Sequence, residues 1–402
     1  MFTHSNWKTT FFTIWTGQAF SQLSSSVLQM AIVWYLIASS NSASIVALSG
    51  IVAFLPQGLL GPFIGVYIDR YNRKNIMIIS DVVIALASLL LVVVGMFTEL
   101  PIWLIMVVLF IRSVGTAFHT PSLQAITPLI VPNDMLTRCA GYSQTFQSIS
   151  LLISPALAAV LFAIWDLNFI IMLDVLGALL AILALCLVKI PDIQRETLST
   201  PNVLKEAKEG IQALKNKGLL GFTFLGALFS LIYMPVFVLF PMMPLSYFEK
   251  TTWHAGLVEV IFAVGMLLGS LILGKWGGFK NRITMIAVAV LMIGGSLAVS
   301  GMLSAHHFLL FLGLSAILGF ASPFFTGIQA VVYQEKIEPQ YLGRVLSFSG
   351  SLMVITTPIG IGLAGIVTEH IGIEKTFLFA GVCISIIGLL YRLISSTRNN
   401  SL

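Results

Sequence analysis

Four charged residues lie inside stretches of sequence that are otherwise almost wholly apolar: Asp81, Arg112, Asp174 and Glu259. One charge at the centre of a bilayer costs roughly 2.5–3.5 kcal/mol on insertion scales, so a charge kept there predicts ion or proton chemistry. Asp174 is our first candidate for an acid that binds and releases a proton, and Glu259 is the second. The alternative for Asp174 is a fixed ion pair, with Arg112 or with a helix end.

Arg112 cannot release its proton, so we expect it to tune a neighbouring acid. A nearby guanidinium favours the charged carboxylate, and separation of the two groups favours the protonated acid. Asp81 is the weakest candidate, because it lies near enough to Arg70 and Arg73 in sequence to be their structural partner.

Polar side chains also form stripes at helical spacing within the apolar stretches. Four of them, in the first stretch, fall within about 60° on a helical wheel and must face protein or water. We therefore predict a substrate cavity lined by these stripes and by aromatic and Met side chains near Pro235. The alternatives are polar contacts between helices for the stripes, and exposure to lipid or ordinary packing for the aromatic and Met side chains. The candidates are Gln18, Gln22, Ser25, Gln29, Thr116, His119, Gln144, Ser148, Tyr233, Met234 and Phe237.

The elements that must position these residues are membrane helices. The chain has 402 residues, of which 57% are hydrophobic and only 9% are charged, unlike a soluble domain. A helix that crosses the bilayer needs about 20 apolar residues, and such runs recur throughout the chain. We predict an all-α integral membrane protein with twelve transmembrane helices, at residues 11–37, 43–67, 76–96, 102–122, 140–163, 168–188, 218–240, 254–274, 283–304, 307–328, 346–368 and 376–394. The first run is too long for a cleavable signal peptide.

Positive charges predict the orientation, because loops rich in Lys and Arg stay in the cytoplasm. With both termini inside, eighteen of the twenty-one Lys and Arg residues fall on the cytoplasmic side. Only Lys250 and Lys375 fall outside, and Arg112 lies within a helix. The net charge of +5 therefore reflects topology and does not indicate nucleic-acid binding.

A polar segment at 189–217 divides the twelve predicted helices into six and six. Within it, Val203, Ala207, Ile211 and Leu214 recur at helical spacing, which predicts an amphipathic linker helix on the inner membrane surface. We therefore expect a bundle at 1–188, a cytoplasmic linker at 189–217 and a second bundle at 218–402.

The two halves resemble each other. The segment at 61–77 aligns with 269–285 at an offset of 208, and the segment at 131–138 aligns with 337–344 at 206. Two near-equal offsets predict a duplicated six-helix unit, which is typical of transporters whose halves rock about a site between them.

Motifs for other chemistry are not convincing. "GSLILGK" (269–275) has the spacing of a phosphate loop, but Trp276 replaces the Ser or Thr that binds magnesium, and "GIGLAG" (360–365) follows no strand. Three scattered cysteines and the pair His306 and His307 have no metal-site spacing. We expect no cofactor, no metal and no enzymatic activity.

"GVYIDRYNRK" (65–74) resembles the loop signature of the major facilitator superfamily, G-x-x-x-D-R-x-G-R-K, through Gly65, Asp69, Arg70, Arg73 and Lys74. Asn72 replaces a Gly, and we expect it to keep the left-handed turn. In the family this loop is a cytoplasmic latch that holds the inner gate shut, so the resemblance implies gating; the alternative is simple anchoring of a helix end. The second copy has Gly277 and Gly278 in place of Asp69 and Arg70, so we expect one latch only.

Two further signatures resemble the same superfamily. Helix four carries Arg112 with Gly115 one position early for the family pattern R-x-x-x-G. Helix five resembles the exporter motif G-x8-G-x3-G-P-x2-G-G, with ordinary helix packing as the alternative. The matching positions are Gly141, Ser150, Ser154, Pro155, Ala158 and Ala159.

Long stretches resemble the macrolide-efflux group within this superfamily, among them "NWKTTFFTIWTGQAFS", "FIRSVGTAFHTPSLQAITPLIVP", "CAGYSQTFQSIS" and "YLGRVLSFSGSLM". This resemblance implies a bacterial plasma-membrane exporter of macrolides by proton antiport, with an ATP-binding partner protein as some members of the group use. An exporter of another amphipathic drug or metabolite is the main alternative, and a non-transporting membrane receptor or scaffold is a distant one.

Overall fold

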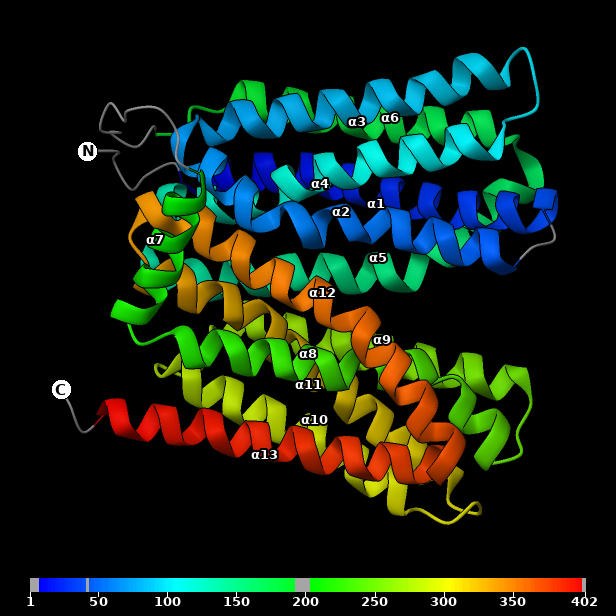
Figure 1. The fold of residues 1–402 in the computed structure, drawn as a ribbon, viewed down its shortest axis with the longest axis vertical. Coiled ribbons are helices and arrows are strands. Elements are labelled where there is room, and N and C mark those ends of the chain that lie inside the picture. Colours follow the sequence, from blue (N-terminus) through cyan, green and yellow to red (C-terminus); the bar gives the residue numbers. More distant parts are fainter. Residues whose placement is uncertain (1–6, 41–42, 192–202, 400–402) are drawn as a thin grey trace. The chain divides into compact units, whose positions relative to one another are not determined.

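The computed structural model describes residues 7–40, 43–191 and 203–399, and helices account for nearly all of them (Figure 1). No strand occurs within these ranges, which confirms the predicted all-α class. The long helices are α1 (Trp7–Ser40), α2 (Ala43–Arg70), α3 (Arg73–Gly95), α4 (Ile102–Ile130), α5 (Leu136–Ile164), α6 (Leu167–Leu187), α8 (Leu220–Leu239), α9 (Thr252–Trp276), α10 (Arg282–Met302), α11 (Phe308–Lys336), α12 (Pro339–Ile371) and α13 (Ile373–Asn399).

Eleven helices in the described ranges are long and apolar enough to cross a membrane. The twelfth long helix, α1, carries the polar stripe that includes Gln18 and Gln22. Large apolar side chains such as Leu86 on α3 and Leu183 on α6 are more than half exposed, as lipid contact requires. The chain is a multi-pass membrane protein.

The chain divides into two units, and α5 and α12 each contribute residues to both. Unit 1 comprises Met1–Asn133, Ser150–Ala213 and Ile337–Val354, and unit 2 comprises Asp134–Ile149, Leu214–Lys336 and Ile355–Leu402. In unit 1, α1 packs on α6, α3 packs on α4 and α6, and α2 packs on α4. In unit 2 the corresponding pairs are α8 with α13, α10 with α11 and α13, and α9 with α11. The same four pairings in both units confirm the pseudo-symmetric duplication.

The predicted linker helix is present as α7 (Val203–Asn216). Leu214, one of its four apolar positions, is fully buried, and Ile211 is more than a third exposed. The side chains of Val203 and Ala207 lie outside the described residues. The segments 269–275 and 360–365, whose glycine spacing resembles nucleotide-binding motifs, lie within α9 and α12.

Candidate functional site

The ion pair of Arg112 and Asp174 forms the centre of a buried polar cluster in unit 1. Arg112 Nη1 donates to Asp174 Oδ2, and Asp174 is only 1% exposed. Ser25 Oγ donates to Asp174 Oδ1 at 2.6 Å, and Ser88 Oγ donates to Oδ2 at 3.3 Å. Arg112 also donates to both hydroxyls, so four helices, α1, α3, α4 and α6, share one hydrogen-bonded network.

Two glycines allow the helices to approach closely enough for this network. A Cβ at Gly177 on α6 would overlap Ser24 Oγ on α1, and a Cβ at Gly115 on α4 would lie 2.7 Å from Ile84 Cγ1 on α3. Both contacts are too short for a side chain. The glycines therefore let α6 approach α1, and α4 approach α3, closely enough for Asp174 to contact Ser25 and for Arg112 to contact Ser88.

A second polar cluster of unit 1 contains Asp81, His119 and Gln18. His119 Nε2 lies 3.4 Å from Asp81 Oδ1, and Gln18 Nε2 donates to Asp81 Oδ2 at 3.5 Å. Asp81 is 4% exposed. The sequence suggested Arg70 or Arg73 as the partner of Asp81. The partner in the structure is His119, which reaches Asp81 from α4 across the helix interface.

The two clusters repeat each other along the helices. Gln18 and Ser25 on α1 are seven residues apart, as are Asp81 and Ser88 on α3 and Arg112 and His119 on α4. Seven residues are close to two turns, or about 10.5 Å, on one helix face. We call the cluster with Asp174 the outer layer and the cluster with Asp81 the inner layer, after the predicted topology.

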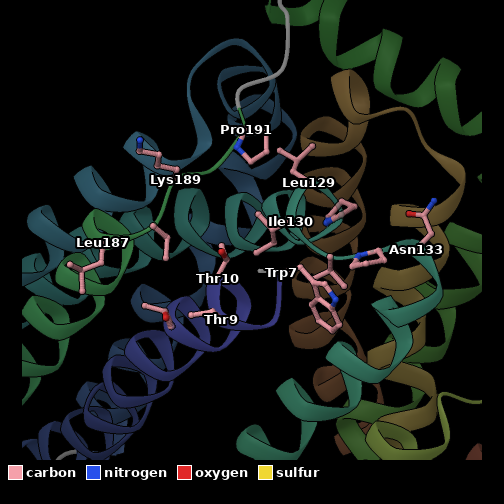
Figure 2. Close-up of a pocket in the computed structure, with 14 residues that line it drawn as sticks. Trp7, Thr9, Thr10, Leu129, Ile130, Asn133, Leu187, Lys189 and Pro191 are labelled. Carbon is pink, nitrogen blue, oxygen red and sulfur yellow. The ribbon is translucent and has the colours of Figure 1, made fainter. Parts of the chain in front are cut away.

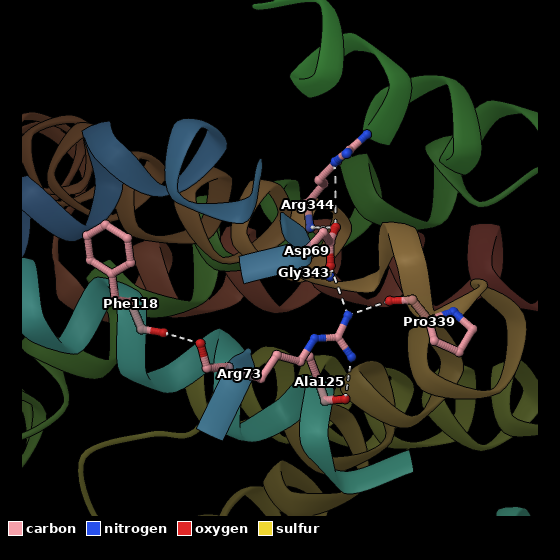
Figure 3. Close-up of polar contacts among 8 residues, drawn as sticks. Asp69, Arg73, Phe118, Ala125, Pro339, Gly343 and Arg344 are labelled. Carbon is pink, nitrogen blue, oxygen red and sulfur yellow. Dashed lines mark hydrogen bonds and ion pairs between the residues drawn. The ribbon is translucent and has the colours of Figure 1, made fainter. Parts of the chain in front are cut away.

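The last turn of α2, just before the loop to α3, carries a buried carboxylate (Figure 3). Asp69 Oδ1 accepts from the amide of Gly343 at 2.8 Å, and Oδ2 accepts from the amide of Arg344 at 3.0 Å. Asp69 also pairs with Arg73 at 2.9 Å and with Arg344 at 3.6 Å. A carboxylate that accepts amides near the start of a helix is favoured by the helix dipole, and this helix is α12.

Arg73 and Lys74 complete this loop by donating to backbone carbonyls. Arg73, 3% exposed, donates to Pro339 O and, at 2.9 Å, to Ala125 O. Pro339 lies four residues before Gly343, so Asp69 and Arg73 bind backbone groups that are about one helical turn apart. Lys74 Nζ donates to Val188 O at 2.8 Å, beyond the last residue of α6.

Gly65 and the linker helix extend this cluster. A Cβ at Gly65 would lie 2.5 Å from Arg344 Cα, so α2 meets α12 backbone to backbone. Arg344 Nη1 pairs with Glu209 on α7 at 2.8 Å. Arg344 therefore joins the α2–α3 loop to the linker helix, a contact that no sequence motif predicted.

The left-handed turn expected at Asn72 is not formed. Its φ of −63° and ψ of 114° are extended, and its side chain accepts from the amide of Asn75 at 3.2 Å as the N-cap of α3. An N-cap requires extended backbone, and Asn is among the best residues for that position. The turn is thus made by capping.

The second copy of the loop is built without a carboxylate, as the sequence predicted. Gly277 is left-handed with φ of 81°, and a Cβ there would meet the Arg138 side chain at 3.3 Å. Arg282 donates to Gly277 O and pairs with Glu335 at 3.1 Å. Arg138 and Arg344 occupy matched positions of the two repeats. In unit 1 the arginine, Arg344, faces the carboxylate of Asp69, whereas in unit 2 the arginine, Arg138, faces Gly277.

The helix-five positions pack closely where their side chains are described. A Cβ at Gly141 would overlap the backbone of Gly274 on α9, within unit 2. Ser150, Ser154 and Ala158 are buried in unit 1. The side chains of Pro155 and Ala159 lie outside the described residues.

The predicted cavity residues divide between the units. Gln18, Ser25, His119 and Thr116 belong to the layers of unit 1 or lie beside them, with Thr116 Oγ1 donating to Arg112 O at 2.9 Å. On the same helix as Ser25, Gln22 is exposed and Gln29 is half-buried.

In unit 2, Gln144 Oε1 accepts from Thr326 at 3.1 Å, and Ser148 donates to Gln144 O. Tyr233 packs on Phe229, its hydroxyl lies 3.2 Å from Ser322 Oγ, and Phe237 adjoins the same ring cluster. Met234 is 37% exposed. Tyr233 and Phe237 thus take part in aromatic packing, and their contact with substrate stays a prediction.

Glu259 stands apart from every other charge. It is exposed on α9 and makes no hydrogen bond or ion pair with any residue in the described ranges. Glu259 belongs to unit 2, whereas Asp174 belongs to unit 1.

One cavity of about 750 Å³ lies in unit 1, where α1 begins and α4 and α6 end (Figure 2). Its lining mixes the Trp7 indole, three threonines of α1 and Lys189 with apolar residues of the two helix ends. None of the predicted cavity residues lines it. The sequence signal that could have found it is the Thr9, Thr10 and Thr13 face of α1.

The repeated helix pairings, the buried membrane charges and the loop cluster define a membrane transporter of duplicated six-helix design. The family model of the Major Facilitator Superfamily matches residues 14–249 and 225–401, and the chain belongs to that superfamily.

Similar proteins agree. The chain is 45% identical over 397 residues to Macrolide efflux protein A of Streptococcus pyogenes, across 98% of each chain. It is 47% identical over 323 residues to Macrolide efflux protein A of Enterococcus faecalis, across 80% of this chain and 100% of the relative. A solved structure of a bacterial homologue of the iron transporter ferroportin has the same fold, with a TM-score of 0.76 and 15% identity over 95% of this chain and 99% of that one.

Proposed function

We propose that the chain exports macrolide antibiotics from the bacterial cytoplasm or inner leaflet by proton antiport through alternating access. The observation that carries this proposal is the 45% identity, along 98% of both chains, to a macrolide efflux protein. Export of another amphipathic drug or metabolite is the alternative. We place the protein in the plasma membrane with both termini in the cytoplasm.

Proton coupling is supported by charges buried in membrane helices. Asp174 is held by Arg112 and two hydroxyls, so it gains a proton only when that ion pair opens. In the proposed cycle, the conformational change separates Asp174 from Arg112. The carboxylate of Asp174 then binds a proton, and it releases that proton when it pairs with the guanidinium of Arg112 again. Glu259 is the second candidate for this role.

Gating is assigned to the loop cluster of Asp69, Arg73 and Arg344. Its buried ion pairs and its hold on the first turns of α12 support a closed cytoplasmic latch. Opening must break these contacts together, which makes the loop a two-state element rather than a passive anchor. The polar residues from Gln18 to Ser148 and the ring cluster around Tyr233 remain proposed substrate contacts.

The test is accumulation of radiolabelled erythromycin by bacteria with and without the protein, repeated after an uncoupler collapses the proton gradient while ATP is kept. We expect lower accumulation with the protein, and loss of that difference with the uncoupler. Export that survives the uncoupler would contradict antiport and favour an ATP-binding partner protein. Unchanged erythromycin together with export of another amphipathic dye would favour the alternative substrate class.

A further inference from the structure

The two polar layers of unit 1 differ in how their charges balance. The outer layer pairs the carboxylate of Asp174 with the permanent cation of Arg112, so it is neutral without any exchangeable proton. The inner layer contains the carboxylate of Asp81 and the imidazole of His119. Since a neutral imidazole leaves Asp81 uncompensated, the inner layer is neutral only when the pair holds one proton.

Among the described residues, no other charge on α3 itself or on the helices near it is shown to pair with Asp81. On α3, Arg73 pairs with Asp69 and Lys74 donates to Val188 O. Gln18 donates from α1 but carries no charge, and the one charged residue of α1 is Lys8, at its start. On α6 the only charge is Asp174, which is negative and already pairs with Arg112 of α4. On α2 the charges are Asp69 and Arg70, at its end, where Asp69 pairs with Arg73.

The geometry leaves room for a proton between the two groups. His119 Nε2 is buried, faces Asp81 Oδ1 at 3.4 Å and has no hydrogen-bond partner among the residues described. A buried polar atom without a partner costs free energy. A proton on His119 would make this approach a charge-assisted N–H···O bond, and a proton on Asp81 would make it a neutral O–H···N bond.

We propose that the inner-layer pair Asp81–His119 is the proton-binding site of the protein in the described conformation. This inference rests on the proposed antiport and adds to it a second carboxylate, about two helical turns from the outer layer. Asp174 takes a proton only after leaving Arg112, whereas Asp81 and His119 hold one while the outer ion pair is closed.

The first test needs no substrate. The thermal midpoint of the full chain in detergent is measured between pH 6 and pH 9 for wild type, for the double variant Asp81→Asn/His119→Gln and for Asp166→Asn. Asp166 is an exposed carboxylate before α6 and serves as the matched control.

On this proposal the folded wild type holds one proton at the pair that the unfolded chain lacks above neutral pH, so its stability falls as pH rises. We expect its midpoint to fall relative to the double variant from pH 7 to pH 9, and Asp166→Asn to follow wild type. Parallel curves for wild type and the double variant would overturn the inference.

The second test counts protons exchanged when erythromycin binds, by calorimetry in two buffers of different ionisation enthalpy. We expect wild type to exchange about one proton more for each erythromycin molecule bound than the double variant does. A double variant that exchanges as many protons as wild type would overturn the assignment. A wild type that binds erythromycin without proton exchange would instead contradict antiport, and the pH curves would still decide where the proton resides.

Discussion

A buried carboxylate is neutralised differently by an arginine and by a histidine. Asp174 meets a guanidinium that stays charged at every physiological pH, whereas Asp81 meets an imidazole whose charge depends on a proton. The sequence placed both acids in membrane helices but named the wrong partner for Asp81. Ser25 and Asp174 are 149 positions apart, so only tertiary packing decides which groups meet.

At this scale we predict that Asp174→Asn abolishes uphill export while macrolide still binds or equilibrates downhill. Removing one partner of a buried ion pair typically costs about 3–5 kcal/mol and leaves Arg112 uncompensated. Asp174→Glu, which keeps the charge, should retain part of the activity. The measurement is uphill and downhill macrolide flux in membrane vesicles, and normal uphill pumping by Asp174→Asn would direct attention to Glu259.

We also predict that Asp69→Asn and Arg73→Ala insert normally but transport at a small fraction of the wild-type rate. Each change removes a charge from the pair that binds the first turns of α12. The control is Lys280→Ala, an exposed cation in the matched loop of the second repeat. Export by both variants at the wild-type rate would reduce the loop to a topological anchor.

The element that carries most of the predicted gating is the approach of α2 to the start of α12. Glycine motifs in the sequence indicated close helix packing, but they could not say which helices meet. Asn72 shows the same limit, because its identity suited a left-handed turn and an N-cap equally, and the cap was formed.

Gly65→Ala should separate α2 from α12, because its Cβ would face backbone atoms that cannot rotate away. Overpacking of this kind costs about 1–3 kcal/mol. Gly50→Ala is the control on the same helix, since a Cβ there meets nothing within 4 Å. A lower thermal midpoint and slower export are expected for Gly65→Ala alone; equal values for the two variants would argue against a tight contact.

Over the whole molecule, hydropathy and internal alignment sufficed to predict the twelve helices and their duplication, because bilayer thickness and backbone hydrogen bonding leave few alternatives. The four matched helix pairings then follow from the repeat. The linker contact between Glu209 and Arg344 and the cavity beside Trp7 depend on side-chain packing that no periodicity encodes.

The predicted topology can be checked with single cysteines in a chain whose three native cysteines are replaced. Lys280→Cys should react with an impermeant thiol reagent only after the membrane is opened, whereas Lys375→Cys should react in intact cells. Both lysines are exposed, so access depends on the side of the membrane alone. The reverse labelling pattern would invert the orientation.

The energetics of the cycle give a further prediction. If one proton enters for each substrate expelled, a membrane potential of 100 mV supplies about 2.3 kcal/mol, enough for a gradient of about 50-fold. In vesicles with an imposed membrane potential and no pH difference, the ratio of substrate concentrations across the membrane should approach this value. A ratio that does not change with the potential would exclude net charge movement.

During synthesis, Asp69 is made long before its partners on α12. The amide of Gly343 lies 274 residues further along the chain, on the penultimate long helix, so the carboxylate enters the membrane surface region well before the groups that satisfy it exist. A chain truncated before α12 keeps the pair of Asp69 with Arg73 but lacks the two amides and the guanidinium of α12 that also bind the carboxylate. The same ion pairs that we assign to gating thus make the first repeat dependent on completion of the second, and an incomplete transporter cannot close them.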